Sequence, residues 1–366
     1  MKLFLVGFKL SIGIEQYLSS IYSCLKQKKV EVKVIGDSKS MNRLGEISLT
    51  NSSSAFRMVF ETLNPFIWIK FVYYQKKFKA DFVIFVSSHT LNFITILLLR
   101  LFTSSKIISV IHDPIPHSGS KFPKIILVSQ YLQIILSHNV VVAGDFLKES
   151  LLSVYPIKES KVIIMPIGNN RKEIPKILNK TKREHFCTLG RIEDYKGIDI
   201  FLEAGLALLK EEKFKNIKFL VAGKGDLTKY EKIIRKYNSE NLEILNYEVS
   251  DLEFDEAIKK SFAVALPYKD ATQTCTIQIA NSLSTPCIVS KSGSLKEIVL
   301  DKKTGEILET NSPEQLKKVF AQLISDEEYL KFLERNAYEY STQNLQWENI
   351  VDNFIKNLQR IQMLES

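Results

Sequence analysis

The stretch 188–204 reads TLGRIEDYKGIDIFLEA and passes from an apolar strand end, through a turn, into helical spacing. Gly190 permits a tight turn, Arg191 and Lys196 follow it, and we predict a helix from Gly197. The unsatisfied N–H groups and the dipole at such a helix start favour phosphate. Two cations held there would neutralise a diphosphate. The plainer alternative is a pair of solvent-facing charges around a turn.

The same alternation of strand and helix extends on both sides of this stretch. Short apolar runs such as KLFLVG (2–7) and IKFLVAG (217–223) are separated by segments of helical spacing. This pattern predicts parallel sheets covered by helices on both faces, with ligands bound at the carboxyl ends of the strands. We therefore expect an α/β protein with two doubly wound, Rossmann-like domains facing across a cleft. Their predicted bounds are 1–168 and 185–345, with a polar linker at 169–184 and a C-terminal helix at 346–366 that packs back on the first domain.

Size and composition place the chain among globular proteins. It has 366 residues, of which 45% are hydrophobic and 25% charged, so two domains are expected. The longest apolar block, FITILLLRLF (93–102), is far shorter than the roughly 20 residues of a membrane-spanning helix. We read the start, MKLFLVGFKLSIG, as a strand and not as a signal peptide. Four cysteines without metal-ligand spacing suit a reducing cytoplasm and predict no metal site.

Charge is distributed unevenly along the chain. Residues 1–183 hold 26 Lys and Arg against 11 Asp and Glu, a net charge of +15, whereas the remainder carries −6. A basic half favours an anionic partner, and the alternative is a solvated lysine-rich face. The segment NPFIWIKFVYYQKKFK (64–79) interleaves aromatic residues with lysines and predicts contact with an anionic membrane surface; the alternative is a core helix with a lysine-rich end. No nucleic-acid motif is recognisable, so no nucleic-acid partner is expected.

A second loop with binding potential follows the predicted strand AVALPY (263–268). The stretch LPYKDATQTCTIQIANSLSTP (266–286) offers hydroxyls and backbone N–H groups at a helix start, which suit phosphate or sugar oxygens. The competing explanation is a simple N-cap formed by Thr272 or Thr274. In VAGKGD (221–226), Gly223 allows close approach of a ligand to the backbone. Neither this turn nor VGFKLSIG (6–13) has the GxGxxG spacing of a nicotinamide site. The candidate donor-binding residues of these loops are Gly13, Gly223, Tyr268, Asp270, Gln273, Thr274, Cys275 and Thr276.

The order of these motifs resembles glycosyltransferase family 4, the "group 1" enzymes of the GT-B fold. The C-terminal motifs are LGRIEDYKGIDIFLEA, FLVAGKGD, LPYKDATQTCTIQIANSLSTPCIVSKSGSLKEIV, TGEILE and a late tryptophan, Trp347. In the N-terminal half, GIEQYLSSIYSCLKQKKVEVKVI is similar to the family's first glycine loop and helix. VIHDPIPH is similar to its acceptor-side histidine segment, and VIIMPIGNN to the turn before the linker.

The resemblance implies transfer of a sugar from a nucleotide-diphosphate sugar, with retention at the anomeric carbon and without a metal or other cofactor. Arg191 and Lys196 match the residues that hold the donor diphosphate, and no Asp-x-Asp triplet occurs in the chain. His112 matches a residue that contacts the transferred sugar or acceptor, and Asp113 and His117 lie on the acceptor side. For a lone histidine, a structural bond to nearby backbone is the alternative. The catalytic candidates are therefore His112, Arg191 and Lys196.

One departure from the family pattern affects the donor. The family's usual pair of glutamates falls on Ala271 and Ile279, and DATQTC is similar to a branch with an Ala-Thr/Ser-Gln-Ser-Gly loop. Sugar contacts would then come from Gln273, the loop amides and Asp270. The expected function is transfer to a saccharide or polyprenyl-diphosphate-linked acceptor in cell-surface polysaccharide biosynthesis (capsule or O-antigen), in the cytoplasm at the inner face of the membrane. The alternative is a catalytically silent relative that binds a nucleotide sugar or a partner glycosyltransferase.

Overall fold

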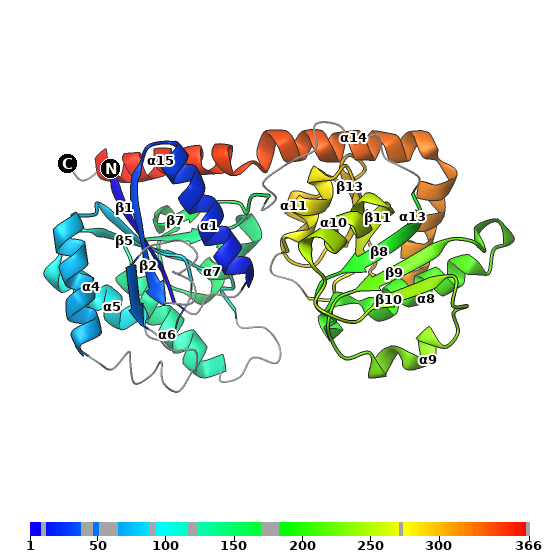
Figure 1. Ribbon diagram of the computed structural model, residues 1–366, viewed down its shortest axis with the longest axis horizontal. Helices are drawn as coiled ribbons and strands as arrows, with labels where there is room; N and C mark the ends of the chain where they lie inside the picture. The colour runs from blue at the N-terminus through cyan, green and yellow to red at the C-terminus, as the bar shows by residue number, and fades with distance from the viewer. Residues whose placement is uncertain are drawn as a thin grey trace. The chain divides into compact units, whose positions relative to one another are not determined.

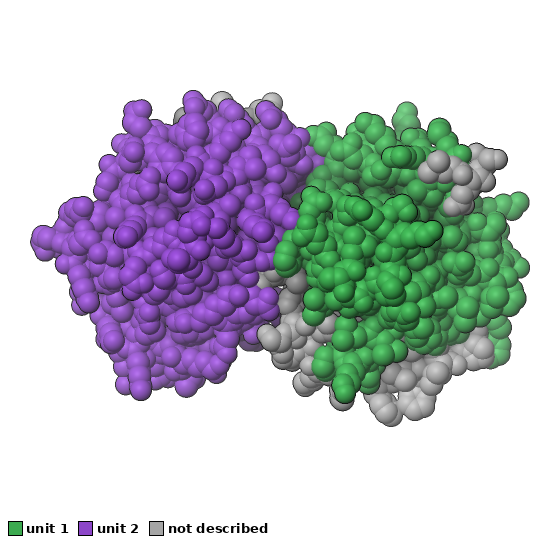
Figure 2. Space-filling model, turned by 180° about the vertical axis from the view of Figure 1, so that it is seen from behind, with its two compact units in different colours: residues 1–167, 347–366 green, residues 168–346 purple. Residues whose placement is uncertain are grey.

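The structure is a computed structural model that forms two compact units. Residues Met1–Ile167 and Trp347–Ser366 make up unit 1, and Gly168–Gln346 make up unit 2 (Figure 2). The residues described are 1–8, 12–37, 47–50, 65–87, 89, 92–115, 123–169, 183–270 and 274–363.

Unit 1 is built on a seven-stranded parallel sheet with the order β3-β2-β1-β4-β5-β6-β7. Strands β1, β4, β5 and β6 are short, mostly apolar runs, buried on both faces as expected for a parallel sheet. The bounds are β1 Lys2–Gly7, β2 Glu31–Asp37, β3 Ile47–Thr50, β4 Phe82–Phe85, β5 Lys106–Val110, β6 Asn139–Val142 and β7 Val162–Ile164.

Helices cover both faces of this sheet (Figure 1). One face packs against α1 (Ile12–Gln27) and α15 (Trp347–Met363), which contact each other, so the end of the chain is part of unit 1. The other face packs against α4 (Pro65–Phe78), α5 (Asn92–Phe102), α6 (Pro123–Leu136) and α7 (Asp145–Val154). A short 3-10 turn, Glu159–Lys161, precedes β7.

Unit 2 has a six-stranded parallel sheet with the order β10-β9-β8-β11-β12-β13. One core cluster packs its sheet against α8, α13 and the start of α14, and a second packs it against α10, α11 and α12. Strand bounds are β8 His185–Leu189, β9 Lys218–Ala222, β10 Leu242–Leu245, β11 Ser261–Leu266, β12 Cys287–Ser290 and β13 Gly305–Leu308. Helix bounds are α8 Ile198–Leu209, α9 Glu231–Ile234, α10 Asp251–Lys259, α11 Thr276–Ser282, α12 Leu295–Ile298, α13 Pro313–Ser325 and α14 Glu327–Asn344.

Several predicted element bounds differ from the structure. Strand β3 was missed, because four residues of mixed polarity give no clear periodicity. Helix α1 begins at Ile12 and therefore includes Gly13, which we had placed in a loop before the helix. Helical spacing continues over residues 251–262, but α10 ends at Lys259, because Ser261 begins β11 and pairs with β8. No helix in the described ranges combines the length and the apolar character needed to cross a bilayer.

Candidate functional site

The turn after β8 places Arg191 and Lys196 in very different surroundings. Lys196 is the last residue of a 3-10 turn, Asp194–Lys196, that lies between Arg191 and α8. Gly197 is the N-cap residue in a left-handed conformation (φ 66°), so the helix starts one residue later than predicted. The Arg191 side chain is 78% exposed. Lys196 is only 9% exposed. The sequence predicted both cations, but the structure buries one and leaves the other at the surface.

Lys196 is a buried cation held between aromatic and backbone groups. Its Nζ lies 5.4 Å from the centre of the Tyr268 ring, and it packs on Gly190, where a Cβ would come within 2.7 Å of it. Among the described residues, no carboxylate forms an ion pair with Lys196. Burial, and secondarily the positive charge of Arg191, lower the pKa of Lys196 to about 8. An ammonium in this environment gains strongly from an anionic ligand.

Glycines allow the turns of neighbouring strands to touch backbone to backbone. A Cβ on Gly223, which has φ +145°, would lie 2.1 Å from the carbonyl oxygen of Gly190. A Cβ on Gly197 would lie 2.0 Å from the carbonyl oxygen of Pro267. The turns after β8, β9 and β11 therefore form one packed edge. This packing holds in place the backbone that surrounds the Lys196 side chain.

This packing predicts a large effect for a small change. Gly197→Ala places a methyl group into the Pro267 carbonyl and forces an L residue into a left-handed conformation, so we expect a loss of at least about 2 kcal/mol in the free energy of unfolding. Chemical denaturation measures it. Gly13→Ala is the control, because no atom lies within 4 Å of the added Cβ. Equal stability of the two variants would contradict the packing described.

The loop after β11 is held by hydrogen bonds that fix Tyr268. The Ser290 hydroxyl and the Asn311 amide donate to the Tyr268 carbonyl oxygen at 2.6 and 3.1 Å. Burial raises the pKa of the Tyr268 phenol. Asp270 is exposed, whereas Gln273 lies outside the described residues. The loop thus brings Tyr268 against Lys196 from a different strand end.

The start of α11 differs from the predicted cap. Cys275 occupies the N-cap position but its side chain does not cap the helix, and the Thr276 N–H donates to the Thr274 hydroxyl at 3.2 Å. Cys275 is half-buried and contributes to the electrostatic environment of Lys196. Thr276 is buried, as is every other residue of this seven-residue helix. Of the predicted donor loop, Thr274 and Cys275 therefore lie beside the Tyr268–Lys196 pair.

A pocket of about 360 Å³ opens at the same edge of the sheet. It includes the predicted residues Arg191 and Gly223, together with a segment after β10 that our sequence reasoning missed. The run LEILNYEV (242–249) reads as a single strand, whereas β10 ends at Leu245, so no local signal marks the residues after it as a loop. The complete lining is Gly190, Arg191, Ala222, Gly223, Lys224, Tyr247, Glu248, Val249 and Phe254.

The candidates of unit 1 lie after β5. His112 Nε2 is 2.9 Å from the Val86 carbonyl oxygen, and because a carbonyl only accepts, this nitrogen carries the proton. Burial lowers the pKa of His112, which favours the neutral imidazole, and its ring packs edge-on against Tyr17 at 5.3 Å. Asp113 is half-buried, and its backbone carbonyl accepts a hydrogen bond from Gln130. His117 lies outside the described residues, and Gly13 is exposed in the first turn of α1.

Comparison with known proteins finds glycosyltransferases. Residues 169–340 match the family model "Glycosyl transferases group 1". An uncharacterised glycosyltransferase of Methanocaldococcus jannaschii is 26% identical over 202 residues, 54% of this chain and 50% of that relative. The chain spans about half the length of this curated relative, and 57% and 64% of two others. A glycosyltransferase structure from Rickettsia africae has a TM-score of 0.76 at 15% identity, covering 98% of both chains. The Anabaena protein HepE in complex with UDP has a TM-score of 0.70 at 14% identity, covering 98% of this chain and 100% of that one.

These likenesses define the class of the protein by its fold. Its two parallel sheets with flanking helices form the fold of GT-B glycosyltransferases, which confirms the predicted fold class. Within it, residues 169–340 carry a domain of the glycosyl transferases group 1.

Proposed function

We propose that the protein transfers a sugar from a uridine-diphosphate sugar to a saccharide acceptor. The observation that carries this proposal is the buried Lys196, which no described carboxylate pairs, at the packed edge of unit 2. HepE, which shares the fold, has been solved with UDP and with UDP-glucose. The narrower assignment to family 4, and to its branch with an Ala-Thr-Gln-Ser-type loop, belongs to the same proposal.

The chemistry that these residues would perform is stabilisation of the leaving diphosphate. As the bond between the anomeric carbon and the diphosphate breaks, negative charge grows on the phosphate oxygens. Lys196, poorly solvated, and Arg191, at the mouth of the pocket, would face that charge more effectively than they would in water. Tyr247 and Phe254 line the adjoining pocket with aromatic rings, which suit the nucleotide base of the donor. Two protein cations would thereby replace a metal, and retention at the anomeric carbon is part of the proposal.

The acceptor side of the proposal is placed on unit 1. We propose His112 as the residue that meets the transferred sugar or the acceptor, with Asp113 beside it, and a saccharide or polyprenyl-diphosphate-linked acceptor in cell-surface polysaccharide biosynthesis. A cytoplasmic protein at the inner face of an anionic membrane fits this role. Burial keeps the imidazole neutral, and the hydrogen bond from Nε2 to the Val86 carbonyl orients it, so Nδ1 would accept a hydrogen bond from a sugar hydroxyl.

A second candidate function is supported by one position. Ile279, which stands where the family has a glutamate, is buried in the core of unit 2, so no carboxylate can hold a ribose from there. A relative that binds a nucleotide sugar without transferring it remains the alternative. Transfer or hydrolysis of any nucleotide sugar by the purified protein would exclude it.

Thermal unfolding with nucleoside diphosphates tests the proposed donor. UDP at about 100 times its Kd should stabilise the protein by about 2.7 kcal/mol, and GDP and TDP should stabilise it less. Arg191→Ala should weaken UDP binding roughly 10-fold or more without unfolding the protein, because the side chain is exposed and its loss removes a charge-assisted phosphate contact. Arg235→Ala is the control, an equally exposed arginine outside the pocket. Absence of stabilisation by all three diphosphates would refute the proposed donor site.

A further inference from the structure

Helix α6 of unit 1 is amphipathic in the reverse sense. It buries three polar residues, Ser129, Gln130 and Gln133, beside Ile134, whereas Ile125 and Val128 on its outer side are 58% and 61% exposed. The buried amides have partners: Gln130 Nε2 donates to the Asp113 carbonyl oxygen and Gln133 Nε2 to the Ser109 hydroxyl. A surface helix of a globular protein normally shows the opposite arrangement. The outer side of α6 is therefore suited to contact with an apolar partner.

The neighbouring helix α5 repeats this feature. Its buried side includes the polar Asn92 and Thr95, and the Asn92 amide donates to the Ser87 carbonyl oxygen at 2.7 Å. On its outer side Leu101 is 67% exposed, with Leu97 and Phe102 also exposed. Two adjacent helices thus expose apolar side chains while they bury polar ones.

Helix α4 extends the same surface. Phe66, Ile69 and Tyr73 recur at helical spacing and are 74%, 63% and 57% exposed. Helix α5 packs against both α4 and α6, and Figure 1 shows these helices on the opposite side of unit 1 from α1 and α15. We call the exposed apolar residues of these three helices the apolar helix face. Contiguous exposed apolar surface of this kind marks an interaction site.

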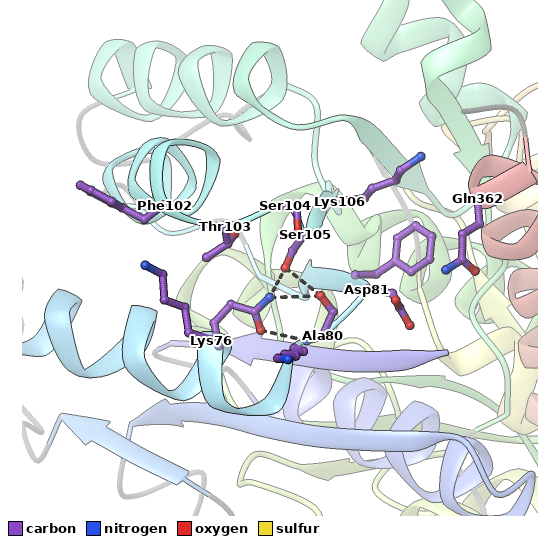
Figure 3. Close-up of a pocket in the computed structure, with 12 residues that line it drawn as sticks. Lys76, Ala80, Asp81, Phe102, Thr103, Ser104, Ser105, Lys106 and Gln362 are labelled. Carbon is purple, nitrogen blue, oxygen red and sulfur yellow. Dashed lines mark hydrogen bonds between the residues drawn. The ribbon is translucent and has the colours of Figure 1, made fainter. Parts of the chain in front are cut away.

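The charge on these helices selects the kind of partner. α4, α5 and α6 contain no Asp or Glu, but they contain three lysines on α4, Arg100 on α5 and Lys124 on α6. At the ends of α4 and α5 a pocket of about 510 Å³ adds Lys79 beside Lys76 and the exposed Phe102 (Figure 3). Lys106 also lines this pocket, but its Nζ donates to the Ile361 carbonyl oxygen of α15. The pocket's one carboxylate, Asp81, already accepts a hydrogen bond from the Lys2 N–H. A second copy of this surface would bring like charges together, whereas anionic lipid complements it.

We propose that the apolar helix face docks unit 1 onto a bilayer that contains anionic lipids. Its apolar side chains enter the headgroup boundary, its lysines and Arg100 meet lipid phosphates, and the aromatic rings of α4 occupy the interface. The sequence predicted such contact for residues 64–79 alone, and the surface argued here spans three helices. This inference rests on the proposed function only for the identity of the acceptor, which a membrane-bound carrier would present beside unit 1.

Vesicle co-sedimentation of the full chain tests the proposal without any sugar donor. We expect the protein to sediment with vesicles of phosphatidylglycerol and phosphatidylcholine, at least 10-fold less with pure phosphatidylcholine, and less as salt rises. Leu101→Glu combined with Val128→Glu should reduce binding at least 10-fold. The matched control, Leu252→Glu, changes an 80% exposed leucine of unit 2 and should leave vesicle binding unchanged.

The outcomes separate this surface from the donor site. The double variant should keep its unfolding temperature and its stabilisation by UDP, because both side chains are exposed in unit 1. Vesicle binding that survives the double substitution, or that is equal for neutral and anionic vesicles, would overturn the proposal. So would a dimer in light scattering that the double substitution dissociates, since the face would then belong to a second copy. If UDP does not stabilise the unmodified protein, that result counts against the proposed function and not against the membrane surface.

Discussion

Lys196→Met is expected to abolish most donor binding while the protein stays folded. Methionine keeps the length and apolar stem of the side chain, and it removes the buried charge that a diphosphate would pair with. The loss of a charge-assisted hydrogen bond costs about 1.5–3 kcal/mol, which is roughly 10- to 150-fold in Kd for UDP. Isothermal titration calorimetry measures this change. Lys213→Met, an exposed lysine beyond the end of α8, is the control and should bind UDP as the unmodified protein does.

The pH dependence of binding gives the same residue a second signature. Because the pKa of Lys196 is about 8 in the folded protein, the ammonium needed to hold the diphosphate is lost as pH rises through that value. UDP affinity should therefore fall about 10-fold between pH 7 and pH 9. Lys196→Met should show no such slope. A parallel slope in both proteins would assign the titration to another group.

Stability should change in the opposite direction from binding. Between pH 8 and the ordinary pKa of 10.5, the unfolded chain binds a proton at Lys196 that the folded chain does not. The free-energy cost of burying the charged ammonium is therefore present at neutral pH. It is relieved as pH rises from about 8 toward 10.5, so the free energy of unfolding increases. Lys196→Met removes the cost and should be at least as stable at pH 7. A less stable variant with unchanged UDP affinity would make Lys196 a structural residue only.

Trp347→Ala is expected to have the largest effect on stability. Trp347 is 5% exposed, begins α15, and its ring lies 5.3 Å from that of Tyr17, edge-on. Truncation of a buried tryptophan costs about 3–5 kcal/mol, which for a unit of this size lowers the unfolding temperature by on the order of 10 °C. The other tryptophan, Trp68 of α4, is only half-buried and serves as the control with a smaller loss.

The consequences of this change should concentrate in unit 1. Tyr17 contacts both Trp347 and His112, so the cavity left by the indole loosens the ring that packs on the proposed acceptor-side histidine. Hydrogen exchange should accelerate in α1 and α15, while UDP stabilisation of unit 2 persists. Exchange that accelerates in unit 2 instead would show that α15 does not belong to the core of unit 1.

The candidate donor site was only partly predictable from the sequence. The strand-turn-helix pattern located Arg191, Lys196 and Gly223, because parallel strands end at one edge of a sheet. The pattern gave no sign that Gly197 and Gly223 are required by carbonyl groups of other turns, since those carbonyls belong to residues remote in the chain. The pocket wall formed by Tyr247 and Phe254 was missed for a related reason: nothing local marks these residues as neighbours of Arg191.

The sequence by itself determined that this chain forms two parallel sheets with helices between the strands, because short apolar runs separated by helical spacing have few other ways to bury their surface. Tertiary structure alone decided which of two nearby cations is buried and which side of α6 faces water. Burial depends on what the rest of the chain brings to a residue: Tyr268 encloses Lys196, and Ser109 gives Gln133 a partner in the interior. Periodicity along the chain carries no information about such neighbours.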